Sequence, residues 1–536
     1  MFRASPCCSV PALLSSVLLM SFGAGQAWLP AQQIFPPSVE WQRCFGGTND
    51  DRVRTLAQTV DGGFILGGFS DSAPASGANG NKTSQNLGNY DFWVVRVNPQ
   101  GNMLWDRAFG GTNEDVLYSL QQTRDGGFVL GGYSLSDANG NKSSASFGGY
   151  DFWVVRLDAN GNKVWDYAFG GTGDDYLRSL SATADGGFIL GGQTLSEPSG
   201  NKTSPLYGTN DFWVVRVDAN GQKIWDRSFG GTGADRLQSL QQTSDGGFIL
   251  GGVSLSGTTG NKTSPNYGLN DYWLVRTDAN GNKLWDRSFG GTDNDELLSL
   301  QQTTDGGFVL GGFSWSGANG NKTTRNSGAT DFWIVRSDAS GTKLWEQSFG
   351  GRDADSPRGL RQTRDGGFIL GGVSSSGTTG TKTTPFYGVT DFWVVRINPA
   401  GEELWEQSFG GTGDDGIWGL ANTEDGGFIF GGGSDSPVNG NKTSPNFGNY
   451  DFWVIKLKSE MPRLRVAAQS PSQIRQDGFR LLMSGVSNNF YRVEYTSDWA
   501  GWIPLQTNQL AGEEVQVMDR GATNAQRRHY RARLLP

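Results

Sequence analysis

Residues 235–289 decide the fold, and they read DRLQSLQQTSDGGFILGGVSLSGTTGNKTSPNYGLNDYWLVRTDANGNKLWDRSF. Aromatic and branched apolar residues gather in four short runs, at 235–243, 248–253, 271–276 and 283–289, which we predict to be β-strands. The DGG at 245–247 and the DANG at 278–281 are tight-turn signals between antiparallel strands, whereas residues 254–270 form a longer connection. The stretch therefore predicts a small antiparallel sheet of four strands.

The same unit occurs seven times along the chain. A W-x-x-x-F-G-G motif begins at Trp41, Trp105, Trp165, Trp225, Trp285, Trp345 and Trp405, and a D-(F/Y)-W motif begins at Asp91, Asp151, Asp211, Asp271, Asp331, Asp391 and Asp451. The first interval between the tryptophans is 64 residues and the others are 60, whereas every interval between the D-(F/Y)-W motifs is 60. The extra four residues lie in the loop at 71–78. Seven such units predict an all-β protein, a seven-bladed β-propeller.

The two ends of the repeat array predict how the ring closes. The array begins at 41–45 with a segment equivalent to the fourth strand of a unit, and the first three strands of that unit are missing before it. The array ends at 452–457 with a segment equivalent to the third strand of a unit. We expect these two segments to pair, so that the N-terminal strand completes the last blade. Such a closure removes an open sheet edge that would favour aggregation.

The repeats define five regions: a signal peptide at 1–27, a lead at 28–40, the propeller at 41–458, a linker at 459–477 and a small β-sandwich-like module at 478–536. Arg3, the apolar stretch 11–22 and small residues at Gly25 and Ala27 are typical of an export signal. That apolar stretch is too short to span a bilayer stably. We expect a monomer without a transmembrane segment, secreted or at the cell surface, with the periplasm as the alternative. Only Cys44 follows the signal, so we expect no intrachain disulfide.

Composition argues against several function classes. The formal net charge of −9 gives no electrostatic basis for binding nucleic acid. His529 is the one histidine of the sequence, so the propeller holds no Ser-His-Asp or Cys-His set. Neighbouring carboxylates such as Asp50 and Asp51 point to opposite faces of a strand, which makes them poor catalytic pairs. We predict no catalytic residue, no metal and no cofactor.

The repeated pattern GGTxxD…DGGF…DFW resembles the repeats of secreted bacterial and archaeal β-propeller proteins. The C-terminal stretches YRVEYTSDWAGW at 491–502 and HYRAR at 529–533 resemble fibronectin-type β-sandwich modules. The DANG turn is also similar to that of quinoprotein propellers, which usually have eight blades and a cofactor-stacking Trp. The first resemblance implies the fold and leaves the activity open.

Two repeated side-chain sets allow either a binding or a structural interpretation. Each long connection carries a lysine, which either joins an anion-binding ring or pairs within its own blade with the aspartate that opens the third strand: Lys82, Lys142, Lys202, Lys262, Lys322, Lys382 and Lys442. Each first strand opens with an aspartate, which either joins a Ca²⁺-binding ring or accepts backbone N–H bonds from the preceding Gly-Gly: Asp51, Asp115, Asp175, Asp235, Asp295, Asp355 and Asp415. Because every unit repeats them, we favour the structural interpretation of both sets.

Specificity should lie where the copies differ. The long connections and the loops before the first strands share one face, and the first strands begin beside it, near the axis. The third residue after the opening aspartate varies: Arg54, Tyr118, Arg178, Gln238, Leu298, Arg358 and Trp418. Arg, Tyr and Trp are enriched at binding hot spots, although drift at solvent-facing positions would look the same. We predict ligand contacts from Arg54, Tyr118, Arg178, Arg358 and Trp418.

The function we expect is that of an exported, non-catalytic binding or surface-structural protein. The propeller would be the scaffold, and the partner an extracellular protein or polysaccharide. The alternatives are a polysaccharide lyase or glycosidase, and an enzyme similar to the quinoprotein propellers.

Overall fold

The computed structural model describes residues 34–497, 501–512, 514–523 and 528–535. The predicted signal peptide at 1–27 lies outside these residues. In the described ranges, no helix has the length and apolar character needed to cross a membrane.

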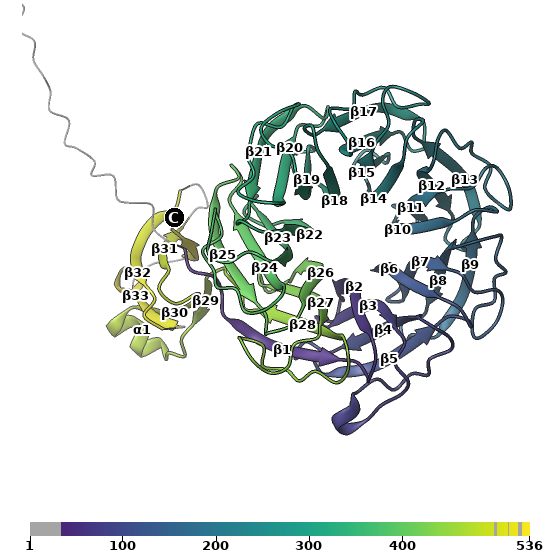
Figure 1. Ribbon diagram of the computed structural model, residues 1–536. Coiled ribbons are helices and arrows are strands. Elements are labelled where there is room, and N and C mark those ends of the chain that lie inside the picture. Colours follow the sequence, from purple (N-terminus) through teal and green to yellow (C-terminus); the bar gives the residue numbers. More distant parts are fainter. Residues whose placement is uncertain (1–33, 498–500, 513, 524–527, 536) are drawn as a thin grey trace, which may run out of the picture.

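Residues 39–457 form seven four-stranded antiparallel sheets, consistent with a β-propeller. Figure 1 shows them arranged in a ring, with the first strand of each sheet innermost. Sheet 1 holds β2 (Asp51–Gln58), β3 (Phe64–Ser70), β4 (Asp91–Val97) and β5 (Met103–Phe109), and the short helix η1 (Gly77–Asn79) lies in its longer loop. Sheet 2 holds β6 (Asp115–Gln122), β7 (Phe128–Ser134), β8 (Asp151–Leu157) and β9 (Lys163–Phe169). Sheet 3 holds β10 (Asp175–Ala182), β11 (Phe188–Thr194), β12 (Asp211–Val217) and β13 (Lys223–Phe229).

The remaining sheets repeat this order. Sheet 4 holds β14 (Asp235–Gln242), β15 (Phe248–Ser254), β16 (Asp271–Thr277) and β17 (Lys283–Phe289). Sheet 5 holds β18 (Asp295–Gln302), β19 (Phe308–Ser314), β20 (Asp331–Ser337) and β21 (Lys343–Phe349). Sheet 6 holds β22 (Asp355–Gln362), β23 (Phe368–Ser374), β24 (Asp391–Ile397) and β25 (Glu403–Phe409). Sheet 7 holds β26 (Asp415–Asn422), β27 (Phe428–Ser434), β28 (Asp451–Leu457) and, from the N-terminal end, β1 (Val39–Phe45).

Sheet 7 is assembled from both ends of the repeat array. β1 runs antiparallel to β28, with Phe45 opposite Phe452 and Trp41 opposite Lys456. This is the strand pairing that the ends of the array predict. Cys44 is buried in this strand, and its Sγ lies 3.1 Å from the Ser444 hydroxyl.

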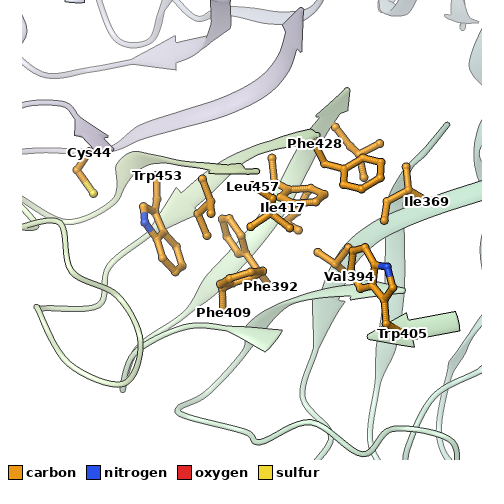
Figure 2. Close-up of a cluster of buried hydrophobic side chains, with 13 residues drawn as sticks. Cys44, Ile369, Phe392, Val394, Trp405, Phe409, Ile417, Phe428, Trp453 and Leu457 are labelled. Atoms are coloured by element: carbon orange, nitrogen blue, oxygen red, sulfur yellow. The ribbon is translucent and has the colours of Figure 1, made fainter. Parts of the chain in front are cut away.

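Interlocking aromatic rings join neighbouring sheets. The second residue of each third strand packs on the tryptophan of the next sheet's third strand, with ring centroids 4.4–4.7 Å apart: Phe92–Trp153, Phe152–Trp213, Phe212–Trp273, Tyr272–Trp333, Phe332–Trp393, Phe392–Trp453 and Phe452–Trp93. The last pair joins sheet 7 to sheet 1. Figure 2 shows the cluster between sheets 6 and 7, where Phe392 lies among Trp453, Ile417 and Phe409.

The paired glycines of each second strand make room for this packing. A Cβ on Gly191 would collide with Leu240 of the next sheet, and a Cβ on Gly192 would collide with the Tyr176 carbonyl of its own sheet. Glycine is therefore required where two backbones and a leucine approach this closely.

The C-terminal residues form a separate unit beside the ring (Figure 1). One three-stranded sheet holds β29 (Arg463–Val466), β30 (Phe479–Ser484) and β33 (Glu514–Asp519), and another holds β31 (Phe490–Thr496), β32 (Ile503–Gln509) and β34 (His529–Leu534). Helix α1 (Pro471–Asp477) and η2 (Arg520–Thr523) complete it. A small core forms around Met483, Tyr491 and Val493.

The segment predicted as a linker, 459–477, differs from that expectation. Its residues 463–466 form β29, which pairs with β30, and α1 begins at a capping box made by Ser470 and Gln473. Its first part is also fixed: the buried Glu460 carboxylate lies 2.9 Å from Arg396 of sheet 6. The short polar segment is thus ordered by specific side-chain partners.

Candidate ligand-binding cavity on the axis

The variable third positions line one cavity of about 380 Å³ at the centre of the ring. All seven contribute: Arg54, Tyr118, Arg178, Gln238, Leu298, Arg358 and Trp418. In every sheet the register between the first two strands shifts at this residue, which makes it a β-bulge. A bulge leaves one residue unpaired and redirects its side chain, so the backbone itself turns the variable residue toward the axis.

The five predicted contact residues form one continuous stack across sheets 6, 7, 1, 2 and 3. The Arg358 guanidinium lies 4.3 Å from the Trp418 ring centroid, and the Arg54 guanidinium lies 3.9 Å from the same ring. Arg54 also lies 5.4 Å from the Tyr118 ring, on which Arg178 stacks at 4.2 Å. Cation–π contacts of this kind hold the guanidinium planes in place and leave their edges free.

The stack carries unused hydrogen-bond donors. Arg54 Nε and Nη1, Arg178 Nε and Arg358 Nε are buried and have no hydrogen-bond partner. Burial, followed by the nearby Arg54 charge, lowers the pKa of Arg358 to about 10. Guanidinium groups that repel one another and lack acceptors favour an anion, most strongly one that accepts two hydrogen bonds.

Little negative charge balances these arginines. Among the described residues that line the cavity, Glu296 is the one carboxylate, and its nearest cation is Arg236 at 3.6 Å. Arg361 adds a further guanidinium to the lining. The cavity therefore has a net positive charge.

The repeated lysines are buried within their own sheets. Each Nζ donates to a nearby backbone carbonyl, as from Lys82 to Ser84 at 2.7 Å, and five others repeat this bond to the residue two positions on: Lys142, Lys202, Lys262, Lys322 and Lys382. Lys442 donates instead to the Ser436 carbonyl. Lys82 is fully buried, and its Nζ lies 5.9 Å from the Trp93 ring. The lysines thus stabilise the long connections within their own sheets. We expected them to pair with the aspartate that opens the third strand, but backbone carbonyls accept their hydrogen bonds instead.

The aspartates that open the first strands have the expected backbone role. Asp51 Oδ2 accepts the Gly47 N–H at 2.7 Å, and the same bond recurs at Asp115, Asp175, Asp235, Asp295, Asp355 and Asp415. In the described ranges, no group of three or more His, Cys, Asp or Glu side chains is placed to hold a metal ion.

A feature that the sequence did not reveal is the pairing of these aspartates across sheets. Asp51 lies beside Asp451 of sheet 7, on either side of Gly46, and every other junction repeats the arrangement. Burial raises the pKa of Asp51 to about 6 and that of Asp451 to about 8, and the nearby Asp51 carboxylate adds to the shift of Asp451. The Oδ1 atom of both residues is buried without a hydrogen-bond partner. No periodic pattern within one unit shows this contact, because its two members belong to different units.

Comparison with known proteins gives only distant likenesses. No protein-family model matches the chain. The regulatory protein FlaEY of Caulobacter vibrioides is 29% identical over 210 residues, which is 37% of this chain and 22% of that protein's length. Among solved structures, hydrazine synthase of Kuenenia stuttgartiensis has a TM-score of 0.43 at 9% identity, covering 72% of this chain and 94% of that one. The BBS1N chain, solved in complex with ARL6DN, has a TM-score of 0.41 at 9% identity, covering 80% of this chain and 98% of that one. These values carry no argument about function.

Proposed function

We propose that this chain is an exported, non-catalytic binding protein that takes an anionic extracellular ligand, an acidic glycan or an acidic protein segment, in its axial cavity. The seven sheets act as a rigid propeller scaffold, closed into a ring by the N-terminal strand. Residues 1–27 direct export and are removed from the mature protein.

The continuous arginine–aromatic stack carries this proposal. Five residues from five different sheets meet in one cavity, although nothing in the repeat requires them to be of these types. Their unpartnered Nε–H groups are buried donors, which are costly unless a ligand accepts from them. An anion supplies that acceptor.

Three observations support the closed scaffold. β1 pairs with β28 over residues 39–45, and Phe452 packs on Trp93 as its counterparts do at the other six junctions. The backbone N–H of Glu424 also donates to the Gln58 side chain across the same boundary, at 2.7 Å. A scaffold held at every junction keeps the stacked arginines in fixed positions.

The charge of the cavity favours binding over glycoside hydrolysis. Glycosidases use two carboxyl groups about 5–10 Å apart, one on each side of the scissile bond. In the described lining of the axial cavity, Glu296 is the one carboxylate, and Arg236 lies beside it.

The test is an array of acidic and neutral glycans and acidic peptides probed with residues 28–536. We expect retention of anionic probes, weakened by salt, and a loss of about tenfold or more in affinity in Arg178→Ala, because a charge-assisted contact is removed. Arg287→Ala is the matched control, since Arg287 also stacks on an aromatic ring, Trp285 at 5.4 Å, but on an outer strand. Equal binding by both variants, or depolymerisation of a bound glycan, would contradict the proposal.

A further inference from the structure

The seven-fold pattern fails at one cross-strand pair of sheet 7. The second residue of each first strand lies opposite the sixth residue of the second strand. In sheets 1 to 6 both members carry side chains: Arg52–Phe69, Val116–Tyr133, Tyr176–Gln193, Arg236–Val253, Glu296–Phe313 and Ser356–Val373. In sheet 7 the pair is Gly416–Gly433.

Packing does not require these two glycines. A Cβ on Gly433 would lie 3.5 Å from Arg52 Cγ and from Tyr450 Cδ1, which is ordinary contact distance. A Cβ on Gly416 would meet two side-chain atoms, Val373 Cγ2 at 3.2 Å and Trp418 Nε1 at 3.7 Å. Neither glycine has the positive φ that favours glycine. Interior glycines of a strand mark a bulge, a tight bend, or the close approach of another backbone or a ligand. Gly416 and Gly433 are paired in register and no backbone atom lies near either Cβ position, which leaves the approach of a ligand.

A hollow of about 280 Å³ lies over the Gly416–Gly433 pair. Arg358 and Trp418 line both this hollow and the axial cavity, so the two adjoin at these side chains. Tyr450 and Arg52 also line the hollow, and the Arg52 guanidinium lies 3.8 Å from the Tyr450 ring centroid. The hollow is thus walled by two aromatic rings, each with an arginine stacked on it.

Polar groups of both kinds face this hollow. Ser356 Oγ lines it and is buried without a hydrogen-bond partner, as is Arg358 Nε. Asp414 also lines it and accepts the Tyr450 hydroxyl at 3.0 Å. The lining therefore offers cationic donors for a carboxylate, a free hydroxyl and a carboxylate for ligand hydroxyls, and aromatic faces for an apolar ring face.

We propose that the hollow over Gly416 and Gly433 is a subsite for one uronic acid unit of an acidic polysaccharide. The sugar ring lies against Trp418 and Tyr450, and its carboxylate is held by Arg358 and Arg52. The missing side chains create this space. Its volume is smaller than the ~300–1,000 Å³ of sites for larger ligands, so it suits a single sugar ring. This subsite rests on the proposed function and names its ligand class.

The test measures calorimetric binding of tetrasaccharides of galacturonate and of mannuronate to residues 28–536, each beside its neutral methyl ester. Gly433→Val restores the residue found at the same position in sheets 4 and 6, and it fills the hollow. Gln193→Val makes the same residue at the matching position of sheet 3, away from the hollow, and is the control. Arg358→Gln removes the charge without shortening the side chain much. The melting midpoint of each variant checks its folding.

We expect wild type to bind at least one acid tetrasaccharide, and its methyl ester at least about tenfold more weakly. Gly433→Val and Arg358→Gln should each weaken acid binding by about tenfold or more, whereas Gln193→Val stays within about twofold. If Arg178→Ala weakens binding but Gly433→Val does not, the subsite is wrong and the proposed function stands. If no uronate binds while another anion from the array does, the ligand class is wrong and the axial site stands. If no anion binds, both proposals fail.

Discussion

Sheets 4 and 7 follow the same four-strand pattern, but sheet 4 is one continuous stretch of chain and sheet 7 takes its outer strand from the N-terminal end. In sheet 4, Trp273 Nε1 donates to Asp286 on the outer strand at 3.1 Å. In sheet 7 the outer strand has Gln42 at that place, and Trp453 Nε1 is buried without a partner. The two sheets have the same strand arrangement, but their side-chain contacts differ.

The difference shows which positions of a sheet must follow the repeat and which are able to change. The residues repeated in all seven units hold the sheets and their junctions together, and they leave no room for specificity. Sheet 7 departs from the repeat at its outer strand through Gln42, at Lys456, which stands where the other sheets have arginine, and at the Gly416–Gly433 pair. The last departure opens a hollow beside the axis, so the sheet that takes its outer strand from the N-terminal end also carries the proposed subsite.

Removing the outer strand of sheet 7 should have the largest effect. Deletion of residues 28–46 takes away β1, including the buried Trp41, Cys44 and Phe45, and exposes the edge of β28. An open apolar edge favours aggregation, so we expect loss of cooperative melting or soluble aggregates in size-exclusion chromatography. Deletion of residues 28–37 leaves β1 intact and is the control. A monomer with an unchanged midpoint after the longer deletion would show that β1 does not close the ring.

The paired aspartates at the junctions predict a dependence of stability on pH. Burial raises the pKa of Asp91, Asp211, Asp271 and Asp391 to about 7 and that of Asp451 to about 8, above the 3.8 of an unfolded aspartate. Between these two values the folded protein binds more protons than the unfolded chain, so these groups contribute stability that is fully present below pH 3.8 and is lost progressively as pH rises from there through about 7 to 8. Asp166, Asp226 and Asp286 have lowered pKa values, because lysine and hydroxyl hydrogen bonds outweigh the opposing effect of burial. Their contribution to the stability of the folded protein is lost as pH falls below 3.8.

We therefore expect the melting midpoint to be highest at about pH 4 and to fall progressively up to about pH 8. Calorimetry at constant ionic strength, with chelator present, measures this. Asp451→Asn keeps the acceptor for the Phe447 N–H and cannot ionise, so it should flatten part of the fall. A midpoint that rises across this range, or that climbs by many degrees on addition of Ca²⁺, would show that these carboxylates are ionised or hold a cation.

The sequence predicts the strands and the axial residues well, because both depend on comparing positions within one repeat. The strands at 248–253 and 283–289 match β15 and β17 to within a residue, and the variable residues such as Arg178 and Trp418 do meet in one cavity. Contacts between units are not visible in the same way. Asp51 and Asp451 are about 400 residues apart, and the Gly416–Gly433 hollow depends on side chains from three sheets. Likewise, β29 and α1 depend on a few partners that have no repeat to reveal them.

The smallest predicted effect is a repair of sheet 7 on the pattern of sheet 1. There Asp106 Oδ2 accepts the Trp93 indole N–H at 3.0 Å and the Ser84 backbone N–H at 2.8 Å. Gln42→Asp places the same carboxylate beside Trp453, whose Nε1 lacks an acceptor, and loses the Gln42 amide bond to Asn441 at 2.9 Å.

A new charge-assisted bond to a buried donor outweighs the loss of a half-buried neutral one, so stability should increase by about 1 kcal/mol. Denaturant unfolding followed by tryptophan fluorescence measures it. Asp286→Asn in sheet 4 is the reverse change and should destabilise by about 2 kcal/mol, because Lys283 and Trp273 lose a charged acceptor. If both Gln42→Asp and Asp286→Asn lower the stability, the expected repair is wrong. The β1–β28 pair of sheet 7 then differs from its counterparts in its backbone and not only in this side chain.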